Sequence, residues 1–376
     1  MKTEINIKKR NPAADIIRCF ALFCVISVHF FKNNGYYDFT MSGGRMYIMT
    51  LMRSFFIICV PLFLILSGFL SRKKTPNVSY FKKIFSILLT YVLASIACVA
   101  YSAIFLKQDW NFVTIVGRIL RYTAAPYSWY IEMYIGLFLM IPFINIVYNN
   151  LPSQKWKLGL IAILIFVTMA PSIVNVYNLD SLSWWLQPST SNSFAKILPE
   201  YWLDFYPITY YVIGCYLSEY GLKIKKWLNL VLIALSVVAS GTYYFWRSHN
   251  GVYIWGAWGA YYSIFTVVLS VLVFMFIMNL NYEKIPQKLA RFFAKISGVC
   301  LGGYLVSWIF DQAFYPILIE KVPFVPDRLE SFVIMVPAVY VCSLLLSYIL
   351  SLVQLVIEKI YSIIMSKFMT LKNKNN

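Results

Sequence analysis

The stretch from Ala13 to Phe31 reads AADIIRCFALFCVISVHFF, and it decides the class of fold. It is apolar almost throughout, and its exceptions are Asp15, Arg18 and His29. About 20 largely apolar residues are enough for one helix to cross the hydrocarbon core of a bilayer. Ionisable groups inside a bilayer are costly and are usually kept for function. The stretch therefore predicts a transmembrane helix that carries functional polar side chains.

The composition extends this prediction to the whole chain. Hydrophobic residues make up 60% and charged residues 13% of the sequence, against about 45–50% and about 25% in soluble domains. Further apolar runs follow at 47–70, 84–106, 127–147, 158–173, 198–217, 227–245, 255–278, 296–314 and 332–357. We expect an all-α, polytopic membrane bundle of about ten transmembrane helices. It forms a single membrane domain over residues 1–360, followed by a short basic tail over residues 361–376.

The distribution of basic residues predicts the orientation in the bilayer. If the N-terminus is cytoplasmic, 22 of the 33 Lys and Arg residues fall in inner segments and ten in outer ones. Cytoplasmic loops are enriched in Lys and Arg, so the N-terminus is predicted to lie inside. An even number of spans then places the C-terminus inside as well. The net charge of +18 has the same explanation, and we expect no nucleic-acid partner.

Three side chains of the first apolar run are predicted to share one helix face. Arg18 and His29 are 11 residues apart, which is about three turns and roughly 16 Å along a helix. Asp15 precedes Arg18 by three residues and can pair with it. His29 can be a core histidine bonded to a neighbour, or a general base, since imidazole exchanges protons near neutral pH.

Other charged residues suggest two further polar regions. Arg53, Glu132 and Asp311 fall in the outer parts of the second, fourth and ninth predicted spans, where they can line a cavity that binds a substrate. The simpler interpretation is that such charges extend to interfacial water. Lys82 and Lys83 precede the third span and can either attract a phosphate-rich ligand or serve as ordinary basic flanks.

The familiar motifs of metal and nucleotide enzymes are missing from the sequence. It contains no HExxH, no Walker loop and no GxGxxG between a strand and a helix. The seven cysteines form no CxxC pair and lie in apolar runs, which is typical of small buried hydrophobes. We therefore expect no metal site and no permanently bound cofactor.

The order of several short motifs resembles the acyltransferase-3 family of bacterial membrane proteins. The first apolar run matches that family's Arg-x10-His signature, with Arg18 and His29 at the signature positions. Similar matches, each loose by itself, occur at residues 53–70, 80–83, 129–143, 206–221 and 302–306. Two positions depart from the family pattern. Ser86 stands where many members have the second Arg of an Arg-x-x-Arg pair that begins at Lys83, and Ser307 stands where many have a His.

The resemblance implies a function and a set of roles. It implies transfer of an acyl group, acetyl in the first instance, from cytoplasmic acyl-coenzyme A to a hydroxyl of a cell-envelope glycan at the bacterial cytoplasmic membrane. In such an enzyme His29 would be the general base, Arg18 would bind the donor, and Asp15 would orient Arg18. Lys82 and Lys83 would attract the phosphates of the coenzyme. The acceptor would bind near the charged residues Arg53, Glu132 and Asp311.

A transporter or flippase of lipid-linked glycans is the alternative function. Buried charges and an outer cavity suit such a protein too. Transporters of this kind are commonly built from internal repeats with broken helices, and the sequence has no obvious internal symmetry. A purely structural membrane protein would not explain Arg18 and His29.

The predicted orientation can be tested directly. A reporter fused after Asn376 is expected to show activity typical of the cytoplasm, because Lys359, Lys367, Lys372 and Lys374 retain that end inside. Paired phosphatase and fluorescent-protein fusions make the measurement. A periplasmic or extracellular signal would contradict an even number of spans with the N-terminus inside.

Overall fold

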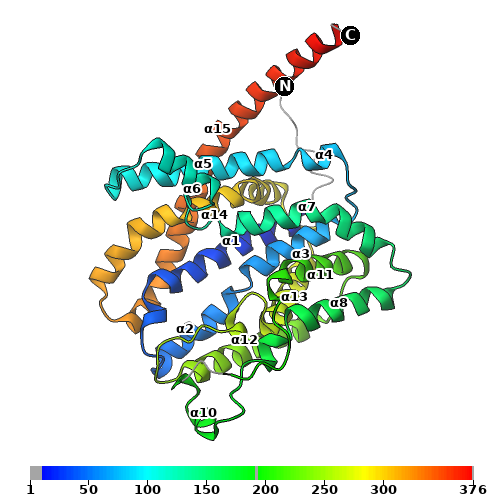
Figure 1. Ribbon diagram of the computed structural model, residues 1–376. Helices are drawn as coiled ribbons and strands as arrows, with labels where there is room; N and C mark the ends of the chain where they lie inside the picture. Colours follow the sequence, from blue (N-terminus) through cyan, green and yellow to red (C-terminus); the bar gives the residue numbers. More distant parts are fainter. Residues whose placement is uncertain (1–10, 191–193, 375–376) are drawn as a thin grey trace. The chain divides into compact units, whose positions relative to one another are not determined.

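The computed structural model describes residues 11–190 and 194–374, and within these the regular elements are helices (Figure 1). The α-helices are α1 (Pro12–Asn33), α2 (Gly43–Phe56), α3 (Cys59–Ser71), α4 (Val78–Phe81), α5 (Ile84–Phe105), α6 (Phe112–Leu120), α7 (Trp129–Asn149), α8 (Gln154–Thr168), α9 (Pro171–Val174), α10 (Leu182–Leu186), α11 (Tyr206–Tyr220), α12 (Lys226–Ser248), α13 (Ile264–Met278), α14 (Gln287–Lys321) and α15 (Phe332–Lys374). Short 3₁₀ turns are η2 (Tyr36–Asp38), η3 (Pro188–Thr190), η4 (Leu203–Phe205), η5 (Ala257–Gly259) and η6 (Val325–Ser331).

The predicted class of an all-helical, multi-pass membrane protein is confirmed. Within the described ranges, 8 helical segments are long and apolar enough to cross a membrane. They contain α1, α2 with α3, α4 with α5, α7, α12, α13, α14 and α15. The fifth and sixth predicted spans correspond to α8 and α11, which have 15 residues each. The count of about ten spans and the orientation stay predictions.

Several predicted span limits need correction. The run 198–217 becomes helical only at Tyr206, after the turn η4, and the run 255–278 becomes helical only at Ile264, after η5. The run 47–70 is split between α2 and α3, two residues ahead of Pro61. Proline lacks the N–H that would bond the carbonyl four residues earlier, so it favours such a break. Apolar character alone does not show these interruptions.

The contacts group the described residues into two compact units. The first unit contains residues up to 75, 140–297 and 314–337, and the second contains 76–139, 298–313 and the residues from 338. Helices α7, α14 and α15 contribute residues to both units. The prediction of one membrane domain over residues 1–360 remains a prediction. The basic tail predicted at 361–376 continues helix α15 as far as Lys374.

The closest helix contact of the first unit joins α3 to α11, which lie side by side in Figure 1. A Cβ atom added to Gly68 would lie 1.9 Å from the carbonyl oxygen of Tyr211, and one added to Gly214 would lie 2.0 Å from that of Ile65. Small residues allow helix backbones to approach in this way, and packing at such sites drives helix association in membranes.

Polar side chains secure one end of the same helix pair. The Asn145 amide donates to the carbonyls of Ser71 and Lys74, each at 2.8 Å, and its oxygen accepts from the Tyr211 hydroxyl at 2.7 Å. Nearby, Glu219 of α11 accepts from Lys157 at 2.9 Å and pairs with Arg72 at 3.2 Å. These bonds fix the end of α3 against α7, α8 and α11.

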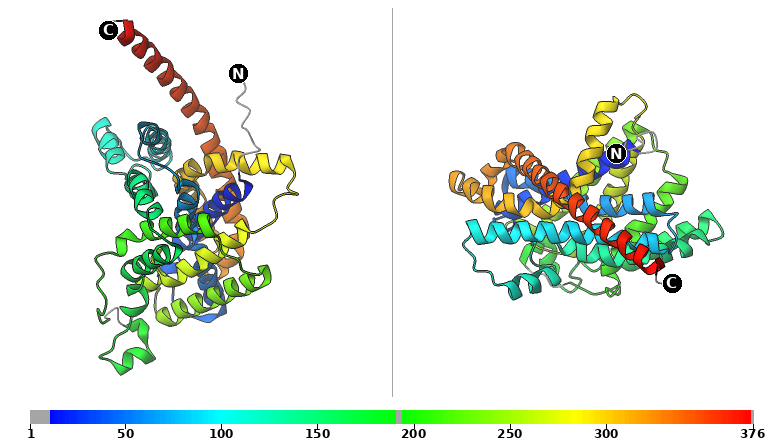
Figure 2. Two further views of the ribbon diagram at one scale, coloured as in Figure 1. Left: turned by 90° about the vertical axis from the view of Figure 1, so that its right-hand side faces the viewer. Right: turned by 90° about the horizontal axis from the view of Figure 1, so that it is seen from above.

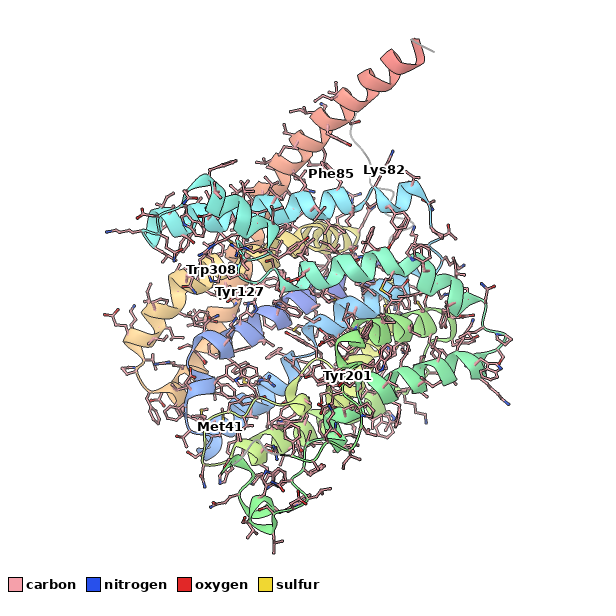
Figure 3. The ribbon with its side chains drawn as sticks, viewed as in Figure 1. Met41, Lys82, Phe85, Tyr127, Tyr201 and Trp308 are labelled. Atoms are coloured by element: carbon pink, nitrogen blue, oxygen red, sulfur yellow. The ribbon has the colours of Figure 1, made fainter. Side chains whose placement is uncertain are left out.

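The opposite end of α3 is preceded by α2, which packs against α12. Tyr47 and Thr242 share a hydrogen bond at 2.8 Å, and Gly241 allows α12 to approach Leu51 closely. The loop after α1 also joins here, since Met41 (labelled in Figure 3) receives a hydrogen bond from Asn250 and donates one to Gly251. The end of α1 near His29 and the end of α12 therefore belong to one side of the unit.

The second unit is built around α5, α6 and parts of α7, α14 and α15. Tyr91 of α5 donates to the carbonyl of Ile119 at 2.7 Å, and Ser347 of α15 donates to that of Val299 at 2.7 Å. Ser86 and Gln354 join α5 to α15 at 2.9 Å. Figure 2 shows α15 continuing as one helix beyond these contacts.

The α3–α11 contact generates a stability prediction. Gly68→Ala and Gly214→Ala are each expected to lower the thermal unfolding midpoint in detergent, because a methyl group inserted against backbone forces the helices apart at a cost of about 1–3 kcal/mol. Gly159→Ala on α8 is the matched control, since no atom lies within 4 Å of its added Cβ. If all three variants unfold alike, the close approach of α3 and α11 contributes nothing to stability.

Candidate functional site

Helix α1 positions the three side chains that the sequence singled out. Asn11 caps its first turn by accepting a hydrogen bond from the Ala13 N–H at 3.0 Å, and Pro12 occupies the first helical position. Both residues favour a helix start at this point. The helix then runs unbroken to Asn33. The predicted spacing of about three turns between Arg18 and His29 is thus realised on one rigid element.

The predicted pair of Arg18 with Asp15 is present. Nη1 of Arg18 lies 3.4 Å from the Asp15 carboxylate and 3.2 Å from the Ser297 hydroxyl of α14. The Asp15 side chain is 3% exposed, whereas that of Arg18 is 33% exposed. Nη1 makes both of these contacts, and Nη2 and Nε of Arg18 contact no polar partner within the described ranges. A partly exposed guanidinium with donors to spare can bind an anion.

His29 lies near the other end of α1 and is buried. Its backbone carbonyl accepts a hydrogen bond from Asn33 at 2.9 Å. The next two residues, Phe30 and Phe31, pack edge to face on each other, and both contact Phe332. His29 therefore belongs to the interior of the unit, beside an aromatic cluster. The second histidine, His249, is exposed after the end of α12.

Arg53 is buried to 1% exposure inside a group of aromatic rings. It donates to the Tyr37 hydroxyl at 2.9 Å and to the carbonyl of Gly259 at 3.1 Å, and it lies 4.8 Å from the ring centre of Tyr253. Burial raises the pKa of Tyr36 and of Tyr253, although the charge of Arg53 opposes the shift. Both phenols therefore stay neutral and can donate hydrogen bonds. The simpler interpretation of the sequence, that Arg53 extends to interfacial water, is wrong for this side chain.

The sequence did not indicate that a second arginine, Arg247, is buried. It was counted among the basic residues of the outer segments. The guanidinium of Arg247 lies between two indole rings, 4.5 Å from the centre of Trp184 and 4.2 Å from that of Trp258. Its side chain has no exposed area, and its nitrogens form no hydrogen bond within the described residues. Stacking against aromatic faces stabilises such a desolvated cation. The stack attaches α10 and η5 to the end of α12.

The second unit holds Asp311 in a network that includes two tyrosines. The Tyr127 hydroxyl (labelled in Figure 3) donates to the Asp311 carboxylate at 2.8 Å, and the Tyr304 hydroxyl donates to the carbonyl of Tyr127. Asp311 and Tyr127 are both buried. Ser307, at the position of the family histidine, donates to the carbonyl of Tyr304 at 2.8 Å. The sequence indicated Asp311 but gave no signal for Tyr127, 184 positions away.

The remaining predicted site residues of this unit are exposed. Lys82, labelled in Figure 3, ends α4, and Lys83 precedes α5. Both side chains are exposed, as a pair that attracts a dissolved anion must be. Ser86, which replaces the family arginine, donates to Glu358 at 2.8 Å. Glu132 is exposed in the first turn of α7, where the helix dipole favours an acidic side chain.

The described residues thus define a class of protein: a helical, multi-pass membrane protein with ionisable side chains buried on and beside its first helix. The model of an acyltransferase domain matches residues 11–352. This covers most of the chain, which therefore belongs to the acyltransferase-3 family, as the resemblance of the motifs predicted. Family and fold together make it a multi-pass membrane acyltransferase. Comparisons with curated proteins and with solved structures gave no match.

Proposed function

We propose that the chain transfers an acyl group, acetyl in the first instance, from cytoplasmic acyl-coenzyme A to a hydroxyl of a cell-envelope glycan. One observation carries the proposal: a single buried helix holds a partly exposed, oriented arginine near one end and a buried histidine three turns later. The first can bind an anionic donor and the second can activate a hydroxyl. The proposed location is the bacterial cytoplasmic membrane.

The donor is assigned to the Arg18 end of α1. Nη1 of Arg18 donates to both the Asp15 carboxylate and the Ser297 hydroxyl, and the Arg18 side chain is 33% exposed. The remaining N–H groups of the guanidinium can donate to two phosphate oxygens of the coenzyme or to the thioester carbonyl. The exposed amines of Lys82 and Lys83 attract the coenzyme's phosphates from the same compartment in the predicted topology. Asp15 acts as a positioning residue.

The chemistry is assigned to the His29 end of α1. Imidazole takes the proton of the acceptor hydroxyl while that oxygen attacks the thioester carbonyl carbon. The C–O bond forms, the C–S bond breaks, and the coenzyme leaves as a thiolate that takes the proton back from the imidazolium. The extended pantetheine arm of the coenzyme can span the roughly 16 Å between Arg18 and His29.

The rival function, transport of a lipid-linked glycan, makes a different prediction for the purified protein. An acyltransferase consumes acyl-coenzyme A and releases the free thiol, whether the acceptor is a glycan or water. A transporter does neither. Thiol release from acetyl-coenzyme A, measured with protein in nanodiscs, therefore distinguishes the two, and a signal equal to that of empty nanodiscs contradicts the proposed activity.

Removing the charge of Arg18 should weaken the use of the donor. Arg18→Ala is expected to raise the KM for acetyl-coenzyme A by roughly tenfold to a hundredfold, because a hydrogen bond to a charged group contributes about 1.5–3 kcal/mol. The variant also removes the Arg18 guanidinium from the buried Asp15 carboxylate, so the amount of folded protein must be measured alongside. Arg121→Ala, an exposed arginine of the second unit, is the control. A well-folded Arg18 variant with an unchanged donor KM assigns Arg18 another role.

Removing the base should abolish transfer. His29→Ala and His29→Gln are both expected to keep less than about a tenth of the wild-type activity, since a general base contributes about 10²–10⁴-fold to the rate. Glutamine preserves hydrogen bonding but cannot take up a proton. His249→Ala should be nearly silent, because that ring is exposed and contacts only Phe245 among the described rings. Labelled acetyl transfer in membranes, normalised to protein amount, gives the comparison. A His29→Gln variant above that limit shows that His29 is not the base.

A further inference from the structure

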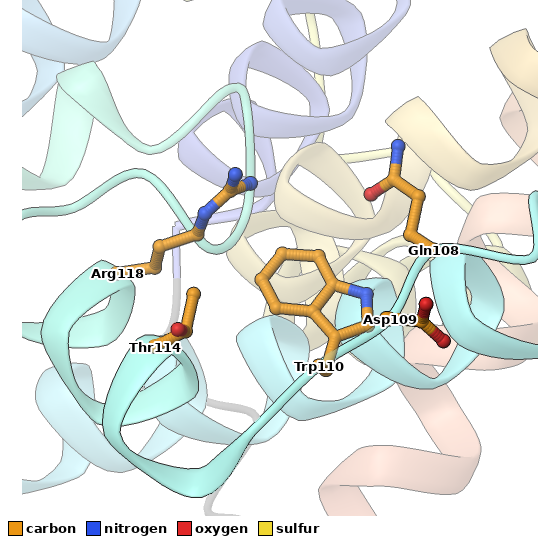
Figure 4. Close-up of a pocket in the computed structure, with 5 residues that line it drawn as sticks. All are labelled: Gln108, Asp109, Trp110, Thr114 and Arg118. Carbon is orange, nitrogen blue, oxygen red and sulfur yellow. The ribbon is translucent and has the colours of Figure 1, made fainter.

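A pocket of about 340 Å³ opens in the second unit, in the connection between α5 and α6. Figure 4 shows its lining, which consists of Gln108, Asp109, Trp110, Thr114 and Arg118. Small-molecule sites in proteins range from about 300 to 1,000 Å³. The pocket is therefore large enough for a single sugar unit, and none of its residues belongs to the site proposed above.

Hydrogen bonds fix the backbone on both sides of the pocket lining. Lys107 adopts a positive φ of 52°, and the N–H groups of Leu106 and Gln108 both donate to the carbonyl of Ser102, at 3.2 and 3.1 Å. The Asn111 side chain caps α6 by accepting from the Thr114 N–H at 2.8 Å. The lining residues 108–110 are thus held between two fixed points. Thr114 and Arg118 are four residues apart on α6 and share a face.

The two faces of α6 predict that the pocket lies at the membrane surface. Its apolar side chains are exposed, namely Phe112, Val113, Val116 and Leu120. A short amphipathic helix with such a face lies in the interface, with the apolar side toward the acyl chains and the polar side toward water. The charge distribution predicts that this connection is on the outer side. The pocket then opens where a membrane-bound glycan would be found.

The lining combines an indole ring with two opposite charges that form no ion pair with each other. The Arg118 guanidinium lies 4.4 Å from the ring centre of Trp110. Neither Arg118 nor Asp109 forms an ion pair with another residue of the described chain. The pocket therefore offers a carboxylate acceptor, guanidinium donors, and the amide and hydroxyl of Gln108 and Thr114, all around one indole.

We propose that this pocket binds one pyranose unit of a glycan. A sugar ring has an apolar face that can pack on Trp110, and vicinal hydroxyls that both donate to a carboxylate and accept from a guanidinium. A phosphate headgroup would meet the Asp109 carboxylate as a like charge, which disfavours it. The assignment of this sugar to the acyl acceptor rests on the proposed function. The proposal that the pocket binds a sugar does not.

Binding is tested without any acyl donor. Full-length protein in phosphatidylcholine nanodiscs, free of glucoside detergents, is mixed with methyl β-D-glucopyranoside or N-acetylglucosamine, and contacts are followed by saturation-transfer NMR. We expect a dissociation constant on the order of 1 mM, which ordinary ligand efficiencies give for a molecule of this size. Asp109→Asn should weaken binding at least about tenfold. Trp110→Ala should abolish it, and Trp110→Phe should retain most of it.

The control variant is Phe112→Ala, which removes a ring from the opposite, apolar face of α6 and should leave sugar binding unchanged. Asp109 is exposed, so its variant reports on the site even if Trp110→Ala fails to fold. The proposal is overturned if neither sugar binds, if Asp109→Asn binds them as the wild type does, or if glycerol 1-phosphate displaces them at equal concentration, which would mark an anion site.

An activity measurement separates this inference from the proposed function. If wild-type protein binds the sugar but never turns over acetyl-coenzyme A, the acyl-transfer function fails and the sugar site stands. If transfer proceeds and Trp110→Ala leaves both sugar binding and the acceptor KM unchanged, the site fails and the function stands. With both correct, Trp110→Ala raises the acceptor KM at least about tenfold and leaves the donor KM as it was.

Discussion

An ionisable side chain among transmembrane helices must find its partners within the protein, because the bilayer offers none. The first unit meets this constraint in three ways. Asp15 and Arg18 form an ion pair supported by the Ser297 hydroxyl. Arg53 is satisfied by a phenol, a backbone carbonyl and several ring faces. Arg247 depends on two indoles. Of these three cations only Arg18 is partly exposed. This difference distinguishes the candidate donor-binding arginine from two arginines that stabilise the structure.

The same constraint explains the aromatic content of the chain, 18% of its residues. Tyrosine and tryptophan offer an apolar body and a polar or π-electron-rich surface at once. They can therefore surround a guanidinium without introducing a carboxylate, which would itself need a partner. Tyr253 illustrates this, since its ring faces Arg53 while its burial keeps the phenol protonated. In the second unit Tyr127 performs a related task by donating to Asp311.

The part of the architecture that follows from local pattern could be predicted, and the part that depends on distant neighbours could not. Helix α1 and its Asp15–Arg18 pair follow from spacing within 22 residues, and the family followed from motif order. Ser297, the other partner of Arg18, lies 279 positions away and no local pattern indicates it. Arg247 resembles an ordinary flanking residue until Trp184 and Trp258 are seen around it. The late starts of α11 and α13 were missed because the apolar aromatic turns before them resemble helix in hydropathy.

Helix α15 is longer than the hydrocarbon core of a bilayer is thick. At 1.5 Å per residue, its 43 residues extend for about 64 Å, whereas the hydrocarbon core is about 30 Å thick. Even a strongly tilted helix therefore has many residues that must leave the acyl chains. Exposed Ile360, Ile363 and Ile364 lie in the second half of the helix. The apolar part of this helix is longer than the hydrocarbon core is thick. The thickness of the bilayer, and not the apolar character of the sequence, therefore determines where the chain enters water.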